Sequence, residues 1–238
     1  NVTDPDLRLA PFYNELREVV DWSYENVTST LCSCLATHAV LEFKYSQKRV
    51  HMGKKHWGVF PHKVIDRSHP LVKGVNTRFD IPHSRFNDVS EAQFEKANAK
   101  VLAKSAVGVH LAVSPDLFRI VFFQGHPEYD SISLLKEYKR EVALYLKGIC
   151  KEYPPFPSNY LSPQSCAILN EYKTRLDTKN ASIKDFPENL IAKTLDNTWH
   201  DSASAIINNW IGSVYQITNE DIKLPFMDSV NPLNPLNL

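Results

Sequence analysis

The stretch VTSTLCSCLATHAVLEFKY, residues 27–45, decides the fold class of this chain. Residues 27–34 are rich in β-branched side chains, as buried strands are, whereas residues 35–45 are good helix formers with an apolar stripe on one face. A helical pattern, residues 12–26, also precedes the strand. Helix, strand and helix in succession predict an α/β fold, with Cys34 at the turn from strand to helix.

Further strands and helices follow from similar patterns. The apolar run LFRIVFF, residues 117–123, predicts a buried strand that pairs as a hairpin with residues 107–114. Residues 133–148 and 202–218 have the spacing of amphipathic helices. Residues 48–88 are rich in Pro, His and Gly, and this composition predicts short strands and loops.

Three segments have weaker patterns. Residues 91–105 predict a helix or a loosely ordered connection. Residues 162–196 are polar and unpatterned, so we expect an insertion within one domain that spans residues 1–238. The tail at residues 230–238 is expected to be loose.

Composition excludes several classes of protein. The chain has 238 residues, 43% hydrophobic and 23% charged, which suits one globular domain with a real core. Lys and Arg total 27, as do Asp and Glu, without long blocks of either sign, so we expect neither a nucleic-acid partner nor a membrane partner. The four cysteines lack CxxC spacing and indicate reduced thiols, which favours a cytoplasmic location.

Cys34 is the candidate nucleophile. A cysteine at a helix N-terminus meets a partial positive charge and free N–H groups, which favour a thiolate and can stabilise an oxyanion. Taken alone, such a cysteine is more often a small buried apolar residue. Cys32 should face the same side but deeper in the sheet, so we assign it to the core.

A second candidate pair lies in QGHPEYD, residues 124–130, just after a predicted strand. His126 and Glu128 can share one face of an extended chain, and the carboxylate would fix the tautomer of the imidazole and support its protonated form. A lone pair of this kind is more often a solvated loop. Together with Cys34 at a neighbouring strand end, however, it predicts the nucleophile, base and orienter of covalent acyl transfer.

The chain resembles a known family in seven ordered segments, which together span most of residues 1–220 apart from 162–196. These are VTSTLCSCLATHAVL, KKHWGVFPH, PHSRFNDV, QGHPEYD, EYKRE, PSNY and NNWIGSVYQIT. Their order and approximate spacing are similar to those of the homoserine O-succinyltransferase and O-acetyltransferase family. The resemblance implies a flavodoxin-like, doubly wound sheet related to the class I glutamine amidotransferases. It also implies transfer of an acyl group from acyl-CoA to the hydroxyl of homoserine through a cysteine thioester, in methionine biosynthesis.

The resemblance also implies roles for particular residues. Cys34 would carry the acyl group, with His126 as proton acceptor and Glu128 as its orienter. Substrate contacts would come from Lys55, Ser84 and Arg140. A guanidinium such as that of Arg140 can hold the carboxylate of an amino acid with two hydrogen bonds.

The acyl donor stays open at this point, and so does the choice of acceptor between homoserine and a similar hydroxy-amino acid such as serine. In the family, a position that aligns with Thr3 tunes the donor, with glutamate linked to acetyl and glycine to succinyl transfer; threonine is neither. We therefore expect acetyl-CoA or succinyl-CoA as co-substrate and no bound cofactor. Where the family usually has a tryptophan followed by small residues after the nucleophile, this chain has residues 35–38, LATH, which would reshape the pocket. Because His56, His62 and His83 lack supporting carboxylate or cysteine spacing, we predict no metal site.

The chain begins inside one of the family's motifs, so the N-terminal portion of the fold is expected to be missing from it. A sheet without those strands would expose an edge, which favours a homo-oligomer or a complementing N-terminal fragment as partner. Two other functions remain open: an amidotransferase-like cysteine hydrolase, and a truncated, non-catalytic relative with a binding or regulatory role.

Overall fold

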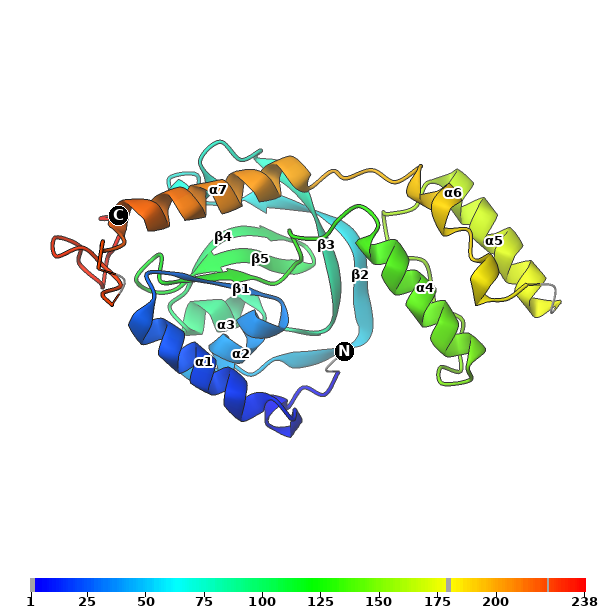
Figure 1. The fold of residues 1–238 in the computed structure, drawn as a ribbon, viewed down its shortest axis with the longest axis horizontal. Coiled ribbons are helices and arrows are strands. Elements are labelled where there is room, and N and C mark those ends of the chain that lie inside the picture. The colour runs from blue at the N-terminus through cyan, green and yellow to red at the C-terminus, as the bar shows by residue number, and fades with distance from the viewer. Residues whose placement is uncertain (1–2, 179–180, 222) are drawn as a thin grey trace.

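The structure, a computed structural model, describes residues 3–178, 181–221 and 223–238. Its centre is one mixed sheet with the strand order β1-β6-β5-β4-β2-β3 (Figure 1). The strands are β1 (Thr30–Ser33), β2 (Val50–Val64), β3 (Arg78–Asp88), β4 (Lys100–Ser105), β5 (Gly108–Val113) and β6 (Ile120–Phe123). The longer helices are α1 (Tyr13–Asn26), α2 (Leu35–Tyr45), α4 (Ser133–Leu146), α5 (Pro163–Asp177) and α7 (His200–Ile217). Short helices are α3 (Glu91–Lys96), α6 (Glu188–Ala192), η1 (Leu7–Leu9), η2 (Pro70–Val72) and η3 (Ile183–Asp185).

The pairing of β1 with β6 positions the site. These two strands are parallel, with Cys32 opposite Phe122 and Ser33 opposite Phe123. Because parallel strands end at the same edge of a sheet, the turn after Ser33 and the loop after Phe123 emerge side by side. The expected hairpin is confirmed, since β5 and β6 are antiparallel with Val113 opposite Val121.

Side chains of β5 and β6 alternate between two cores. Phe122 and Cys32 pack with residues of α1, α2 and α3 on one face, and the expected core position of Cys32 is confirmed. Phe123 and Leu111 pack with Ile206 of α7 on the other face. Figure 1 shows α7 on one side of the sheet and α1 to α3 on the opposite side. The predicted α/β fold is confirmed, with helices on both faces of the sheet.

The expectation of short strands and loops over residues 48–88 is wrong. β2 and β3 form a long antiparallel pair that curls past the other strands (Figure 1). Two of the three prolines in this segment lie within strands, at positions where a missing N–H is tolerated. Pro82 lies on the edge strand β3, and Pro61 precedes the short region, Lys63 and Val64, where β2 also pairs with β4.

Residues 91–105 contain both a helix and a strand. The helix α3 ends before Asn98, whose φ of 54° is left-handed, and β4 follows at once. Neither of the two expected conformations covers the whole segment. A left-handed asparagine is a common way to end a helix, and here it turns the chain back into the sheet.

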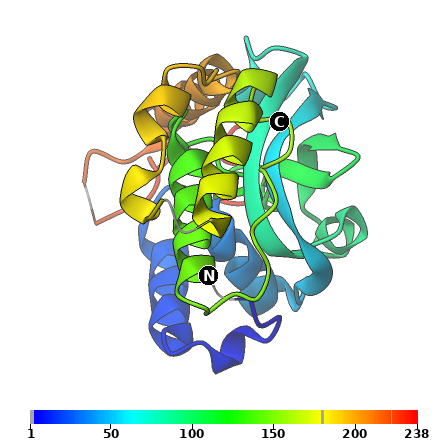
Figure 2. The same ribbon diagram turned by 90° about the vertical axis from the view of Figure 1, so that its right-hand side faces the viewer.

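Residues 162–196 are not unpatterned, because they form α5, η3 and α6. Leu169, Tyr172 and Leu176 recur at helical spacing and are buried in the same core as the sheet, with Ile191 of α6. The helices α5 and α6 stand beside α4, at the curled side of β2 (Figure 2). The placement of this segment as an insertion stays a prediction. In the tail, Leu236 packs partly on the core whereas Leu233 is 81% exposed.

None of the helices described is long and apolar enough to span a membrane.

Candidate active site

Cys34 lies in a tight turn between β1 and α2. Its φ of 48° and ψ of −102° are unusual for a residue with a side chain, and such conformations persist only where the surroundings hold them. Its N–H donates to the carbonyl of Phe123 over 2.7 Å. The Thr37 hydroxyl donates to the carbonyls of Cys32 and Phe123 over 2.9 and 2.8 Å. These bonds fix the thiol at the end of the parallel strand pair, where sequence reasoning placed it.

His126 and Glu128 lie in the loop that follows β6. Nδ1 of His126 is 2.7 Å from Oε1 of Glu128, and the main-chain N–H of His126 donates to the carbonyl of Pro82 over 2.8 Å. The Ser33 hydroxyl donates to Glu128 over 3.2 Å, and the ring of Tyr129 stacks on His126 with centroids 4.3 Å apart. The imidazole is therefore held by Glu128 at Nδ1 and by the Tyr129 ring on one face, which leaves its Nε2 for Cys34.

Two neighbours, Cys34 and Glu128, decide the charge of His126. Burial by itself lowers the pKa of His126, but hydrogen bonds and charge interactions with Cys34 and Glu128 outweigh it and raise the pKa to about 9. Burial by itself raises the pKa of Glu128, and the imidazolium lowers it overall. The arrangement favours an imidazolium beside the sulfur of Cys34, and a cationic neighbour of this kind activates a cysteine nucleophile.

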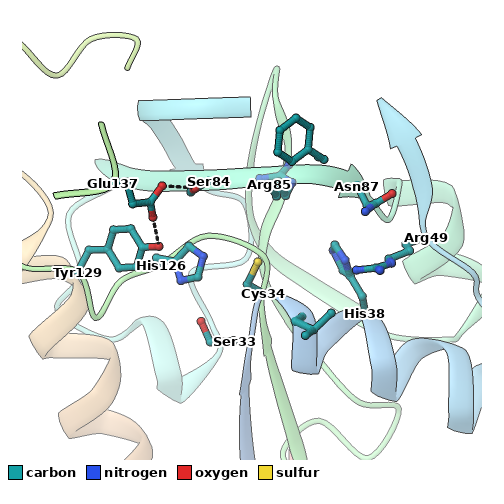
Figure 3. Close-up of a pocket in the computed structure, with 12 residues that line it drawn as sticks. Ser33, Cys34, His38, Arg49, Ser84, Arg85, Asn87, His126, Tyr129 and Glu137 are labelled. Atoms are coloured by element: carbon teal, nitrogen blue, oxygen red, sulfur yellow. Dashed lines mark hydrogen bonds between the residues drawn. The ribbon is translucent and has the colours of Figure 1, made fainter. Parts of the chain in front are cut away.

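The thiol faces a cavity of about 390 Å³ (Figure 3). Its lining comes from the end of β1, from α2, from the residue before β2, from β3, from the loop after β6 and from α4. The lining residues are Ser33, Cys34, Leu35, His38, Arg49, Ser84, Arg85, Phe86, Asn87, His126, Tyr129 and Glu137. In Figure 3, His126, Tyr129, Ser84 and Glu137 lie on one side of Cys34 and His38 and Arg49 on the other. A small polar substrate can therefore reach the thiol between two walls of different character.

Glu137 organises one wall of this cavity. It accepts hydrogen bonds from the Ser84 hydroxyl over 2.5 Å and the Tyr129 hydroxyl over 2.6 Å, and it lies 3.3 Å from Nζ of Lys55. Burial by itself raises the pKa of Glu137, but these donors lower it overall, so the carboxylate is charged. Sequence reasoning missed Glu137, although it lies in the EYKRE segment one helical turn before Arg140.

Comparison with known proteins identifies the family. A family model described as homoserine O-succinyltransferase matches residues 1–220. The chain belongs to this family. The family resemblance noted in the sequence is thereby confirmed.

Two relatives with the name homoserine O-succinyltransferase align with the whole chain. The protein from Nitrosococcus oceani is 61% identical over 242 residues, and the one from Thioalkalivibrio nitratireducens is 60% identical over 241 residues. In each case the alignment covers 68% of the relative. Among solved structures, a glutamine amidotransferase from Methylobacillus flagellatus aligns with a TM-score of 0.49 and 14% identity, over 88% of this chain and 72% of that one.

Two of the substrate contacts implied by the family resemblance lie at the Glu137 wall. Ser84 donates to Glu137, as described above. Lys55 packs over the ring of Trp57 at 4.0 Å and has 11% of its side chain exposed, whereas the neighbouring Lys54 is exposed. Burial lowers the pKa of Lys55. The structure thus separates the two lysines that sequence alone could distinguish only by family register.

Arg140 and Thr3 do not line the cavity. The Arg140 side chain is 52% exposed on α4 and lies 3.3 Å from Glu141, which also faces Lys55 at 3.9 Å. Thr3 is exposed, and its main-chain carbonyl accepts a hydrogen bond from Asn87, which does line the cavity. The substrate and specificity roles of both residues stay predictions.

Two of the four residues that follow Cys34 reach the pocket, and the departure of this segment from the family pattern stays a prediction. Leu35 and His38 both line the cavity. Nε2 of His38 is 2.9 Å from Oε1 of Gln124, and burial lowers the pKa of His38 to about 3. His38 is therefore a neutral, fixed wall residue.

Three other histidines form a buried histidine cluster: His62 on β2, His83 on β3 and His110 on β5. Nε2 of His83 is 3.3 Å from Nε2 of His62, and the His62 and His110 rings are 5.4 Å apart. Within residues 3–178, 181–221 and 223–238, neither nitrogen of His110 has a hydrogen-bond partner, and no group of three His, Cys, Asp or Glu residues is placed to hold a metal. Burial lowers the pKa of His62 to about 4 and the pKa values of His83 and His110 well below the usual value.

Gly125 separates this cluster from His126. A Cβ at Gly125 would lie 2.3 Å from Cγ2 of Ile81 and 2.9 Å from Cε1 of His83. Only glycine therefore allows the loop after β6 to approach β3 closely enough for the hydrogen bond between His126 and Pro82.

Proposed function

We propose that this protein is an acyl-CoA-dependent transferase that moves an acyl group to the hydroxyl of homoserine through a thioester on Cys34. The observation that carries the proposal is the cavity in which Cys34 meets His126, with Glu128 on the far nitrogen of the imidazole. The names of the relatives support homoserine as acceptor.

In the first half-reaction, the Cys34 thiolate attacks the thioester carbonyl of the acyl-CoA. The carbonyl carbon forms a bond to Sγ and loses its bond to the sulfur of CoA, and the imidazolium of His126 supplies the proton that the departing thiolate takes. Glu128 keeps the imidazole in the required tautomer and orientation.

In the second half-reaction, neutral His126 takes the proton of the homoserine hydroxyl as its oxygen attacks the acyl carbon. The bond to Sγ breaks, and the thiolate and imidazolium return together. The charged Glu137 and the Ser84 hydroxyl provide fixed polar groups on the His126 side of the thiol, which suits the ammonium and hydroxyl of an amino-acid acceptor.

The test is steady-state turnover of the purified protein with acyl-CoA and homoserine. We expect release of CoA thiol together with O-acylhomoserine, and no ammonia from glutamine. Ammonia release from glutamine without acyl transfer would favour the cysteine hydrolase instead, and no turnover with either substrate would favour a non-catalytic relative.

The role of Arg140 rests on the family resemblance and has its own test. If its guanidinium holds the acceptor carboxylate, Arg140→Lys should slow discharge of the acyl-enzyme by homoserine by the equivalent of about 1.5–3 kcal/mol, because lysine cannot make the paired hydrogen bonds. Lys136→Ala, an exposed cation on the same helix, is the control. Equal discharge rates in the wild type and both variants would make Arg140 a surface charge.

A further inference from the structure

The two ends of the cavity carry opposite charge. Glu137 is the carboxylate on the His126 side of Cys34, whereas Arg49 and Arg85 line the remainder of the cavity. Figure 3 shows Arg49 reaching toward Cys34 from the side opposite Glu137. An acyl group bound to Cys34 would thus lie between an anionic and a cationic wall.

Arg49 is an unusual cation because it is buried without a carboxylate partner. Only 4% of its surface is exposed, and no carboxylate oxygen lies within ion-pair distance of it in the part of the chain that the structure describes. Its partners are main-chain carbonyls, of Asp4 through Nη2 and of Pro5 through Nε over 3.4 Å. A buried charge that is not neutralised is costly, so its retention beside a cavity favours an anionic ligand.

The nearby groups do not cancel this charge. Cys34, Glu42 and Asp4 interact with the charge of Arg49, but no carboxylate of the described residues forms an ion pair with it. Burial raises the pKa of Glu42, which disfavours its anion. Arg85 adds a second cation; it is 4% exposed and pairs with Asp88 over 2.9 Å. Its Nε has no hydrogen-bond partner among the described residues. The cavity wall made by Arg49 and Arg85 therefore keeps unused donors for an anion.

We propose that Arg49, supported by Arg85, binds the free carboxylate of a dicarboxylic acyl group while the other end of that group is bound to Cys34. The inference rests on the thioester chemistry proposed above and narrows the donor to the succinyl class, since an acetyl group has no carboxylate to offer. The guanidinium can donate two parallel hydrogen bonds to the carboxylate while it keeps its hydrogen bonds to the main-chain carbonyls of Asp4 and Pro5. Arg49 is thus a specificity-determining residue for the first half-reaction.

The experiment compares rates of acyl-adduct formation on Cys34 from succinyl-CoA, butyryl-CoA and acetyl-CoA. Butyryl-CoA matches the chain length of the succinyl group but lacks its carboxylate. We expect the wild type to prefer succinyl-CoA over butyryl-CoA, and Arg49→Gln to reduce that preference by about 10- to 100-fold, the range for a hydrogen bond to a charged group. Arg49→Lys should retain part of the preference because the charge remains.

Lys48→Gln is the matched control, since it removes an exposed cation next in sequence and should leave the preference unchanged. Adduct formation from acetyl-CoA reports whether Arg49→Gln is folded. An equal loss with all three donors would make Arg49 a support for the Asp4–Pro5 backbone and overturn the inference, as would an unchanged preference. The absence of adducts from any donor in the wild type would instead contradict the proposed function itself, and this inference with it.

Discussion

His126 and the buried histidine cluster lie on either side of Gly125, yet their pKa values are shifted in opposite directions. Hydrogen bonds and charge interactions with Cys34 and Glu128 raise the pKa of His126 to about 9. His83 has the guanidinium of Arg85 and the His62 ring as polar neighbours, and its pKa falls far below the usual value. Burial acts against the charged form in both places, so partners alone account for the difference.

This contrast shows that the partners of His126 distinguish it from the other buried histidines. Among the described histidines, burial alone would select the cluster, His38 and His69, each of which is at most 2% exposed. The carboxylate at 2.7 Å and the thiol at a strand end select His126 instead.

Removing the thiol should abolish the reaction. We expect Cys34→Ala to lower acyl transfer by a factor on the order of 10⁴ or more, because no other group can carry the acyl chain. Turnover with acyl-CoA and homoserine is the measurement. Cys32→Ala, which empties a buried core position in the same strand, should retain most of the activity, and near wild-type activity in Cys34→Ala would rule out the acyl-enzyme.

Changing the two members of the histidine pair should have unequal effects. His126→Asn removes the proton acceptor and should cost about 10²- to 10⁴-fold in rate. Glu128→Gln leaves the imidazole in place but weakens its orientation and charge, so its loss should be smaller. Rates for the two variants come from the same turnover measurement. Wild-type rates in both would show that neither His126 nor Glu128 takes part in the reaction.

One NMR titration of the histidine rings compares the two regions directly. His126 should titrate near pH 9, whereas His62 should stay neutral down to about pH 4. Since the folded pKa of His126 is raised, its stabilising contribution is complete below about 6.5 and is lost as the pH rises through about 9. The His126 midpoint should move down in Glu128→Gln and Cys34→Ala. A wild-type midpoint near 6.5 would contradict the assigned ion pair.

The buried histidine cluster should make the fold sensitive to acid. Its histidines stay neutral when folded but protonate when unfolded, so each costs about 1.4 kcal/mol per pH unit as the pH falls below about 6.5. His110→Leu should be neutral or slightly stabilising at pH 7.5, because its ring packs against Phe79 and Phe123 and its nitrogens are unpartnered within the described chain.

Urea unfolding between pH 5 and 8 measures that effect. The pH dependence of the unfolding free energy should be flatter in His110→Leu and unchanged in His200→Leu, since His200 is 68% exposed. Identical slopes in wild type and His110→Leu would mean that His110 is protonated in the folded protein.

Much of the fold and the meeting of Cys34, His126 and Glu128 at one edge of the sheet could be predicted because the signals are local. The change from a strand pattern to a helix pattern indicates that Cys34 lies at a strand end. The apolar strand before Gly125 indicates the same for His126 and Glu128. β2 and β3 could not be predicted, because whether Pro61 and Pro82 fit a strand depends on which of its edges is paired.

The binding walls were missed for a different reason. Glu137 gains its role from Ser84, Tyr129 and Lys55, which reach it from three separate segments. Arg49 is similarly unremarkable in sequence, next to the exposed Lys48, and only burial without a carboxylate partner in the described structure sets it apart. Long-range contacts of this kind leave no periodic pattern in the chain.

The most direct test of the central claim is the intact mass of the protein after mixing with succinyl-CoA alone and then with homoserine. The account predicts one succinyl adduct, mapped to Cys34 by peptide analysis, that forms without homoserine and disappears when homoserine is added, with O-succinylhomoserine as product. Product formation by the Cys34→Ala variant, or an adduct that homoserine cannot discharge, would contradict it.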